Sequence, residues 1–233
     1  MITVRPASER GVTKFGWLDS RHTFSFGDYR DPKHVHFRTL RVINDDVVGA
    51  GGGFDTHPHR DMEIITVMLE GELVHRDSMG HQESLKPGEV QVMTAGSGLL
   101  HSEHNGSASE PAHLIQTWIF PEAKGLTPSY AQREFPVGAR RDRLVRVAGK
   151  GNGDGALPIN QDAALYLSRL TAGGTATHTL APGRGAWVHV AAGEATVNGT
   201  TLRAGDGAAI EDEATITLNG VAPETDVLLF DLA

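Results

Sequence analysis

Four side chains in the first half of the sequence have the types and spacing of a metal site. His57 and His59 are two residues apart, and so are His101 and Glu103. Residues at positions i and i+2 of a strand point to the same face of a sheet, so each pair can direct two ligands to one point. The intervals also match, with 44 residues from His57 to His101 and 44 from His59 to Glu103. We therefore predict one metal site built by two ligand pairs.

The ligand types indicate which metals the site can hold. Three neutral imidazoles and one carboxylate suit a divalent first-row transition ion, and they leave two positions open if the ion is octahedral. Dioxygen and a substrate can bind at such open positions. Iron, zinc, manganese, nickel and copper all accept this ligand set, so the ligands alone do not select one of them. Because the chain has no cysteine, thiolate ligands, disulfides and a cysteine nucleophile are excluded.

Short runs of alternating apolar and polar residues must position these ligands. They include RTLRVI, EIITVML, EVQVM and HLIQTWIF in the first half and ALYLSRL, AWVHV, ATITL and DVLLF in the second. The chain also has 28 glycines, 11 prolines and only 21% charged residues. This composition is typical of an all-β protein with short strands and tight turns. We expect a helical turn only around QDAAL, at residues 161–165.

A weak internal repeat predicts two similar units. VMLEGELVHRDSMGHQESLKPGEVQVM lines up with HVAAGEATVNGTTLRAGDGAAI, each reading strand, Gly-Glu, strand, turn, Leu-x-x-Gly and strand. We interpret the repeat as a duplication, with a chance similarity of two hairpins as the alternative. The expected fold is two antiparallel β-barrels of the jelly-roll type, at residues 1–140 and 141–233. The turn-rich stretch GKGNGDG, at residues 149–155, is interpreted as part of their connection.

The second unit is expected to bind no metal. The positions equivalent to His101 and Glu103 fall around Leu218 and Gly220, whose side chains cannot coordinate an ion. Only His178 lies near the position of the first histidine pair.

The ligand segments resemble the paired motifs of the cupin superfamily and, in detail, the signatures of the pirin family. The similar segments are HPHRDMEIITVMLEGELVHRDSMG, MTAGSGLLHSEHN, WLDSRHTFSFGDY and RVINDD. This resemblance covers most of residues 10–135, extends more faintly to the C-terminus, and is specific to bacterial members described as quercetin 2,3-dioxygenase-like. It implies a bicupin whose metal ligands are His57, His59, His101 and Glu103. General cupins instead take a glutamate from the first motif, which would be Glu63.

Three further side chains have alternative interpretations. Glu63 lies an even number of residues from His57 and His59, which on one strand would place it on the same face. It either faces the same cavity as a base or is a buried acid paired with a nearby donor. Gln116 either lines the cavity through its amide or makes an ordinary strand hydrogen bond, which we favour. His104 has the opposite parity to His101, so we expect a turn residue that points away from the metal.

The resemblance implies an Fe(II)-dependent dioxygenase that cleaves a flavonol such as quercetin with O2, with Glu103 or Glu63 removing the proton of the substrate hydroxyl. A different class shares every ligand: a non-enzymatic, iron-binding regulatory protein whose interaction surface responds to the oxidation state of iron. A cupin isomerase or sugar-binding protein is a third, less favoured alternative. A substrate-sized cavity beside the metal favours the enzyme, whereas a flat charged surface favours the interaction protein.

The charge and the termini restrict the partners and the location. A formal net charge of -8 gives no global field to attract nucleic acid, so none is expected as a direct partner. The N-terminal residues lack the apolar core of a signal peptide, and no apolar run approaches the roughly 18 residues of a membrane span. We therefore expect a cytoplasmic monomer without a membrane partner.

Overall fold

The computed structural model describes residues 1–151 and 153–233. Its regular structure consists of β-strands and three short 3-10 segments, η1 (Ala7–Glu9), η2 (Val137–Arg140) and η3 (Gly153–Gly155). The prediction of an all-β protein is therefore confirmed. The helical turn expected around QDAAL is wrong, because Ala163 already begins a long strand that pairs with the C-terminal strand.

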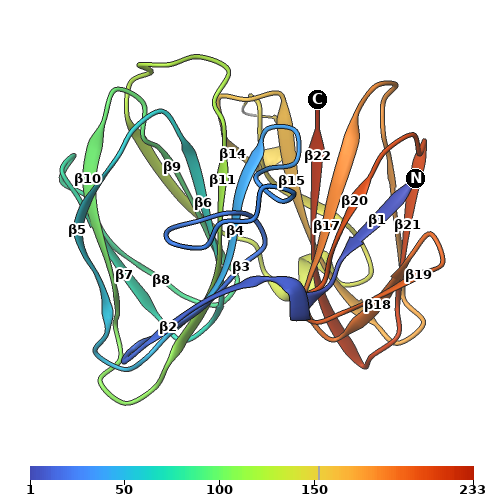
Figure 1. Ribbon diagram of the computed structural model, residues 1–233, viewed down its shortest axis with the longest axis horizontal. Helices are drawn as coiled ribbons and strands as arrows, with labels where there is room; N and C mark the ends of the chain where they lie inside the picture. Colours follow the sequence, from blue (N-terminus) through green and yellow to red (C-terminus); the bar gives the residue numbers. More distant parts are fainter. Residues whose placement is uncertain (152) are drawn as a thin grey trace.

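The first unit is a sandwich of two antiparallel sheets (Figure 1). The four-stranded sheet has the order β5 (Gly53–His59), β10 (Leu99–Asn105), β7 (Leu73–Asp77) and β8 (Gln82–Leu85). The seven-stranded sheet has the order β12 (Ser129–Glu134), β9 (Glu89–Thr94), β6 (Glu63–Glu70), β11 (Ala112–Ile119), β4 (Leu40–Val48), β3 (Leu18–His22) and β2 (Gly11–Phe15).

The second unit also has a four-stranded and a seven-stranded sheet, and its strands are antiparallel except for the last pair of the larger sheet. Its four-stranded sheet has the order β16 (Thr175–Thr179), β21 (Thr215–Gly220), β18 (Glu194–Val197) and β19 (Thr200–Arg203). Its seven-stranded sheet has the order β1 (Ile2–Arg5), β20 (Gly207–Ile210), β17 (Gly185–Ala192), β22 (Glu224–Leu232), β15 (Ala163–Thr171), β13 (Val145–Gly149) and β14 (Leu157–Pro158).

The topology confirms a duplicated jelly-roll. The order β9-β6-β11-β4 in one large sheet matches β20-β17-β22-β15 in the other, and β5-β10-β7-β8 matches β16-β21-β18-β19. The repeated segments seen in the sequence are β6 to β9 and β17 to β20. Each unit is a sandwich of two separate sheets within the described residues, so the term barrel applies only in the loose sense of the jelly-roll.

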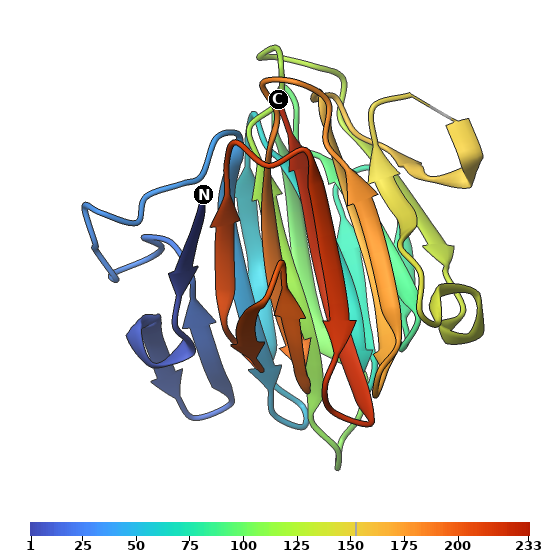
Figure 2. The ribbon, with the colours of Figure 1, turned by 90° about the vertical axis from the view of Figure 1, so that its right-hand side faces the viewer.

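The N-terminal strand crosses between the units. β1 pairs with β20 at the edge of the second unit's large sheet, and the chain then passes through η1 into the first unit (Figures 1 and 2). Residues 2–5 therefore belong by pairing to the second sandwich, although they lie in the predicted first domain. The predicted boundary after residue 140 falls between η2 and β13 and stays a prediction. In the predicted connection, Asn152 lies outside the described residues.

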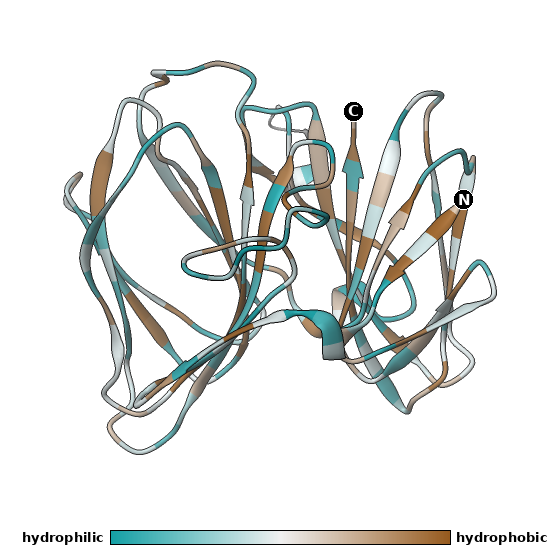
Figure 3. Ribbon diagram, viewed as in Figure 1, coloured by the Kyte–Doolittle hydropathy of each residue, from teal (hydrophilic) through white to brown (hydrophobic). Residues whose placement is uncertain are grey.

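A large apolar core joins the two seven-stranded sheets. It combines residues of both units, among them Ile65, Val67, Val92 and Ile115 of the first and Trp187, Leu228 and Phe230 of the second. Hydrophobic residues lie mainly in the strands, whereas the connecting loops are mostly hydrophilic (Figure 3). No helix among the described residues is long and apolar enough to cross a membrane.

The interiors of the two sandwiches differ in polarity. The second has one large apolar cluster, with Val188, Val197, Leu218 and Leu229 among its buried side chains. The first has two smaller apolar clusters, one around Leu18, Val48, Met68 and Leu114 and the other around Ile64, Met93 and Leu99. Buried polar residues lie on the same strands between these clusters, including Asn44, Thr66, His101, Glu103 and Gln116. Burying polar groups costs free energy, so this layer marks the candidate site.

Candidate metal centre

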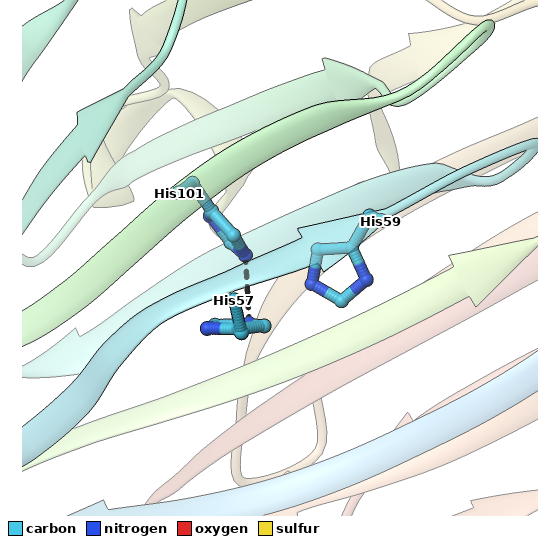
Figure 4. Close-up of side chains that lie close together, drawn as sticks. All are labelled: His57, His59 and His101. Atoms are coloured by element: carbon cyan, nitrogen blue, oxygen red, sulfur yellow. Dashed lines mark hydrogen bonds between the residues drawn. The ribbon is translucent and has the colours of Figure 1, made fainter.

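Three imidazoles converge between β5 and β10. His57 lies opposite His101 in the antiparallel register, and Leu99 lies opposite His59. The rings of His57, His59 and His101 have centroids 4.4 to 4.8 Å apart, and the Nε2 atoms of His57 and His101 are 3.0 Å apart (Figure 4). The predicted convergence of these three side chains is thus present in the structure.

The donor atoms fit a metal ion. His57 Nδ1–H donates to the backbone carbonyl of Asp55 at 2.7 Å, which places the lone pair on Nε2, the nitrogen that faces His101. Two nitrogen ligands about 2.1 Å from one ion and at right angles to each other are about 3 Å apart, which matches the His57–His101 spacing. His59 Nε2 is shielded from solvent and has no hydrogen-bond partner in the described part of the chain.

Burial keeps two of these imidazoles neutral. It lowers the pKa of both His59 and His101 to about 3, and the neighbouring histidines act in the same direction. Both side chains are therefore unprotonated at neutral pH, as a metal ligand must be.

Glu103 faces the same interior from β10 and is held by a short chain of hydrogen bonds. Gln116 Nε2 donates to Glu103 Oε2 at 2.9 Å and Oε1 at 3.2 Å. The indole Nε1 of Trp118 donates in turn to Gln116 Oε1 at 3.1 Å. The interpretation of Gln116 as an ordinary strand residue is therefore wrong, because its amide orients the candidate anionic ligand.

His75 is a member of the site that the sequence reasoning missed. Donor atoms of His75, His101 and Glu103 lie within 4.8 Å of one another, so this group shares His101 with the three imidazoles. His75 is fully buried on β7, opposite Glu103, and its Nε2 lies 3.3 Å from Asp77 Oδ2. The sequence pattern that could have identified His75 is the alternation of Leu73, His75 and Asp77, which places all three on one face of a strand.

Glu63 does not face this interior. Its carboxylate accepts a hydrogen bond from Thr94 Oγ1 at 2.8 Å and another from Asn160 Nδ2 at 3.3 Å. Burial raises the pKa of Glu63. Strand alternation predicted the wrong face because Glu63 is not on the same strand as His57 and His59. β5 ends at His59, β6 begins at Glu63, and Asp61 between them is in the left-handed region at φ 51°. Glu63 is thus a buried acid paired with nearby donors.

Two other histidines lie away from the three imidazoles. His104 lies within the paired part of β10, so the prediction of a turn residue is wrong. Its ring does point to the face opposite His101, and its Nε2 lies 3.5 Å from Asp55 Oδ1. His178, on β16, contacts Asp231 Oδ2 through Nε2 at 2.7 Å. Leu218 and Gly220 are buried on β21, the strand equivalent to β10, and Leu218 packs in the apolar core.

A cavity of about 550 Å³ opens beside the candidate ligands, within the range of roughly 300–1,000 Å³ typical of small-molecule sites. His57, His59 and Glu103 form part of its wall. Five aromatic side chains also line it: Phe15, Trp17, Phe26, Phe54 and Trp118. The site therefore combines metal-binding groups with a space for a flat apolar molecule.

Similarity to known proteins extends over the whole chain. The Pirin family model matches residues 4–119, and a model described as a quercetinase C-terminal cupin domain matches residues 146–232. A quercetin 2,3-dioxygenase of Escherichia coli K12 is 47% identical, over 100% of this chain and 99% of that protein. A pirin-like protein of Caulobacter vibrioides is 41% identical, over 100% of both. The crystal structure of the bacterial pirin YhhW from Escherichia coli in complex with nickel(II) has 47% identity and a TM-score of 0.94, over 100% of this chain and 99% of that one.

Proposed function

Because the chain belongs to the pirin family, we propose that it is a metal-dependent dioxygenase that cleaves a flavonol such as quercetin with O2, and that its metal is Fe(II). One observation carries this proposal: candidate metal ligands form part of the wall of an aromatic cavity large enough for such a substrate. The names of the relatives support the reaction, since several are called quercetin 2,3-dioxygenase or putative quercetin 2,3-dioxygenase.

One divalent ion would be held by His57, His59, His101 and Glu103. The convergent imidazoles and the oriented carboxylate support this assignment. When bound, the ion would supply positive charge that favours an ionised substrate hydroxyl and, if it is iron, the redox capacity for chemistry with dioxygen. Nickel accepts the same ligand types, so the nickel(II) bound by the Escherichia coli pirin supports a divalent metal without selecting iron.

The side chains of the cavity would bind and orient the substrate. Trp118 packs edge to face against His59, with centroids 4.8 Å apart, and Trp17 packs in the same way against Phe54 at 5.0 Å. A flat aromatic molecule can stack on these rings and displace water from the ligands. Glu103, which is buried in the cavity wall, is the carboxylate that we propose takes the substrate's hydroxyl proton, since Glu63 lies outside the cavity lining.

The cavity distinguishes this function from a regulatory one. A non-enzymatic protein that responds to the oxidation state of iron would need the same ligands but no space beside them. The volume of about 550 Å³ at the ligands therefore favours the enzyme.

Oxygen uptake tests the proposal. The purified protein is stripped of metal, reconstituted with Fe(II) under argon, and mixed with oxygenated buffer with and without each of a panel of flavonols. We expect flavonol-dependent oxygen consumption and release of carbon monoxide, and neither in a His57→Ala/His101→Ala double variant. No turnover of any flavonol with iron, manganese, nickel or copper would contradict the proposal and favour the regulatory function.

A further inference from the structure

One wall of the cavity is polar and lies on strands that supply no proposed ligand. Ser20 and His22 face the cavity from β3, and Asn44 and Asp46 face it from β4. All four are at most 4% exposed. Ser20 pairs with Asp46 and His22 with Asn44 in the antiparallel register, so the four side chains form a compact patch.

Hydrogen bonds to Asn44 and to the neighbouring Thr13 satisfy the imidazole of His22. Its Nδ1 contacts Asn44 Oδ1 at 2.8 Å, and its Nε2 contacts Thr13 Oγ1 at 2.8 Å. Both ring nitrogens therefore have partners within the protein. The patch does not need a ligand to account for His22.

Asp46 differs, because one of its carboxylate oxygens has no partner. Asp46 lies opposite Ser20 in the antiparallel register. Its Oδ1 is shielded from solvent and has no hydrogen-bond partner among the described residues. Burial raises the pKa of Asp46 to about 7, so the protein alone solvates this carboxylate poorly. A buried acceptor without a donor is costly, and a hydroxyl group of a ligand in the cavity would supply the missing donor.

We infer that Asp46 is a specificity-determining residue, whose carboxylate accepts a hydrogen bond from a second hydroxyl group of the substrate, distinct from the hydroxyl that faces the metal ligands. The substrate class is therefore a polyhydroxylated flavonol or a similar polyphenol rather than an aromatic compound with a single hydroxyl. This inference rests on the proposed function, because it requires that a flavonol occupies the cavity.

The charge and position of the patch support this assignment. The aromatic residues of the cavity offer no selectivity between hydroxylated and bare rings, since both stack on them. A carboxylate that is desolvated in the free protein gains a charge-assisted hydrogen bond only from a ligand that carries a donor. A site built to hydrogen-bond a substrate hydroxyl rejects an analogue without it, because the buried group then stays unpaired.

Flavonol binding under argon tests the inference without any turnover. Nickel(II)-loaded protein is titrated with quercetin and with unsubstituted flavonol, which carries a single hydroxyl, and binding is followed by the absorbance of the ligand. Wild type should prefer quercetin. Asp46→Leu, which keeps the size and removes both oxygens, should weaken quercetin binding by about 10- to 100-fold, the usual effect of losing a hydrogen bond to a charged group, and change unsubstituted flavonol by less than about threefold.

Asp212→Asn is the control, because Asp212 is exposed to solvent on the second unit and is not part of the cavity lining. It should leave both affinities within about twofold, as expected for a solvated charge. Equal nickel content and an unfolding temperature at least as high as that of wild type establish that Asp46→Leu is folded. Equal binding of the two flavonols by wild type, or an unchanged preference in Asp46→Leu, contradicts the inference alone. Failure of wild type to bind either flavonol contradicts the proposed function as well.

Discussion

At the scale of single residues, neighbouring groups either orient a candidate ligand by hydrogen bonds or keep it unprotonated. The backbone carbonyl of Asp55 fixes the tautomer of His57, and burial keeps His59 and His101 neutral. Gln116 restricts Glu103 by donating to both of its oxygens. Such partners orient ligands before the metal arrives, so they contribute to affinity without touching it.

Gln116→Leu should weaken the affinity for a divalent ion by about 10- to 100-fold, because Glu103 loses the donor that orients it. The control is Thr66→Val, an isosteric change on the neighbouring strand opposite Gln116, where the buried hydroxyl has no hydrogen-bond partner among the described residues. Metal affinities are measured by competition with a chromophoric chelator. Equal affinities of Gln116→Leu and wild type would show that the hydrogen bonds do not position Glu103.

At the scale of elements, strand alternation correctly predicted which side chains converge within paired strands, but it failed across a turn. It correctly brought His57 and His59 together with His101, because β5 and β10 pair directly. It failed for Glu63, since the turn at Asp61 reverses the face. Alternation also could not place Gln116, because its strand is buried on both faces, one toward the cavity and one toward the second unit. Only the tertiary packing decides which face is which.

The turn before β10 depends on Gly96, which belongs to the segment MTAGSGLLHSEHN. Gly96 has φ 47°, and an added Cβ would collide with the backbone carbonyl of Leu126. Gly125 has a similar φ of 68° but open space around it. Gly125→Ala should therefore cost only the backbone strain of about 1–2 kcal/mol, and Gly96→Ala distinctly more. Urea unfolding of both variants checks the order, and equal costs would contradict it.

At the scale of the whole molecule, the two sandwiches differ in their interiors but share one apolar core. The second interior is apolar where the first holds its polar layer, and the large sheets of both share one core. The repeat in the sequence predicted the duplication, but not the crossing of β1 into the second unit, because four residues carry no periodic signal strong enough to assign a partner.

The shared core predicts that both units unfold together. Trp187 of the second unit packs against Phe24 and Phe37 of the first, with ring centroids 5.0 and 5.7 Å away. Trp187→Ala should lower the free energy of unfolding by about 3–5 kcal/mol in a single transition, with metal affinity nearly unchanged. The exposed Val221→Ala serves as the control. Two separate transitions, with only one shifted by Trp187→Ala, would show that the units fold independently.

The central claim is that Glu103, and not Glu63, is the anionic ligand of the metal. Glu103→Gln removes the negative charge from the proposed ligand set while nearly preserving its shape, whereas Glu63→Gln alters a carboxylate that pairs with Thr94 and Asn160. Both variants are titrated with Fe(II) under argon beside the wild type. We predict that Glu103→Gln loses at least about 10- to 100-fold in affinity and that Glu63→Gln stays within a few-fold. Loss of the metal in Glu63→Gln with retention in Glu103→Gln would contradict the account at its most specific residue.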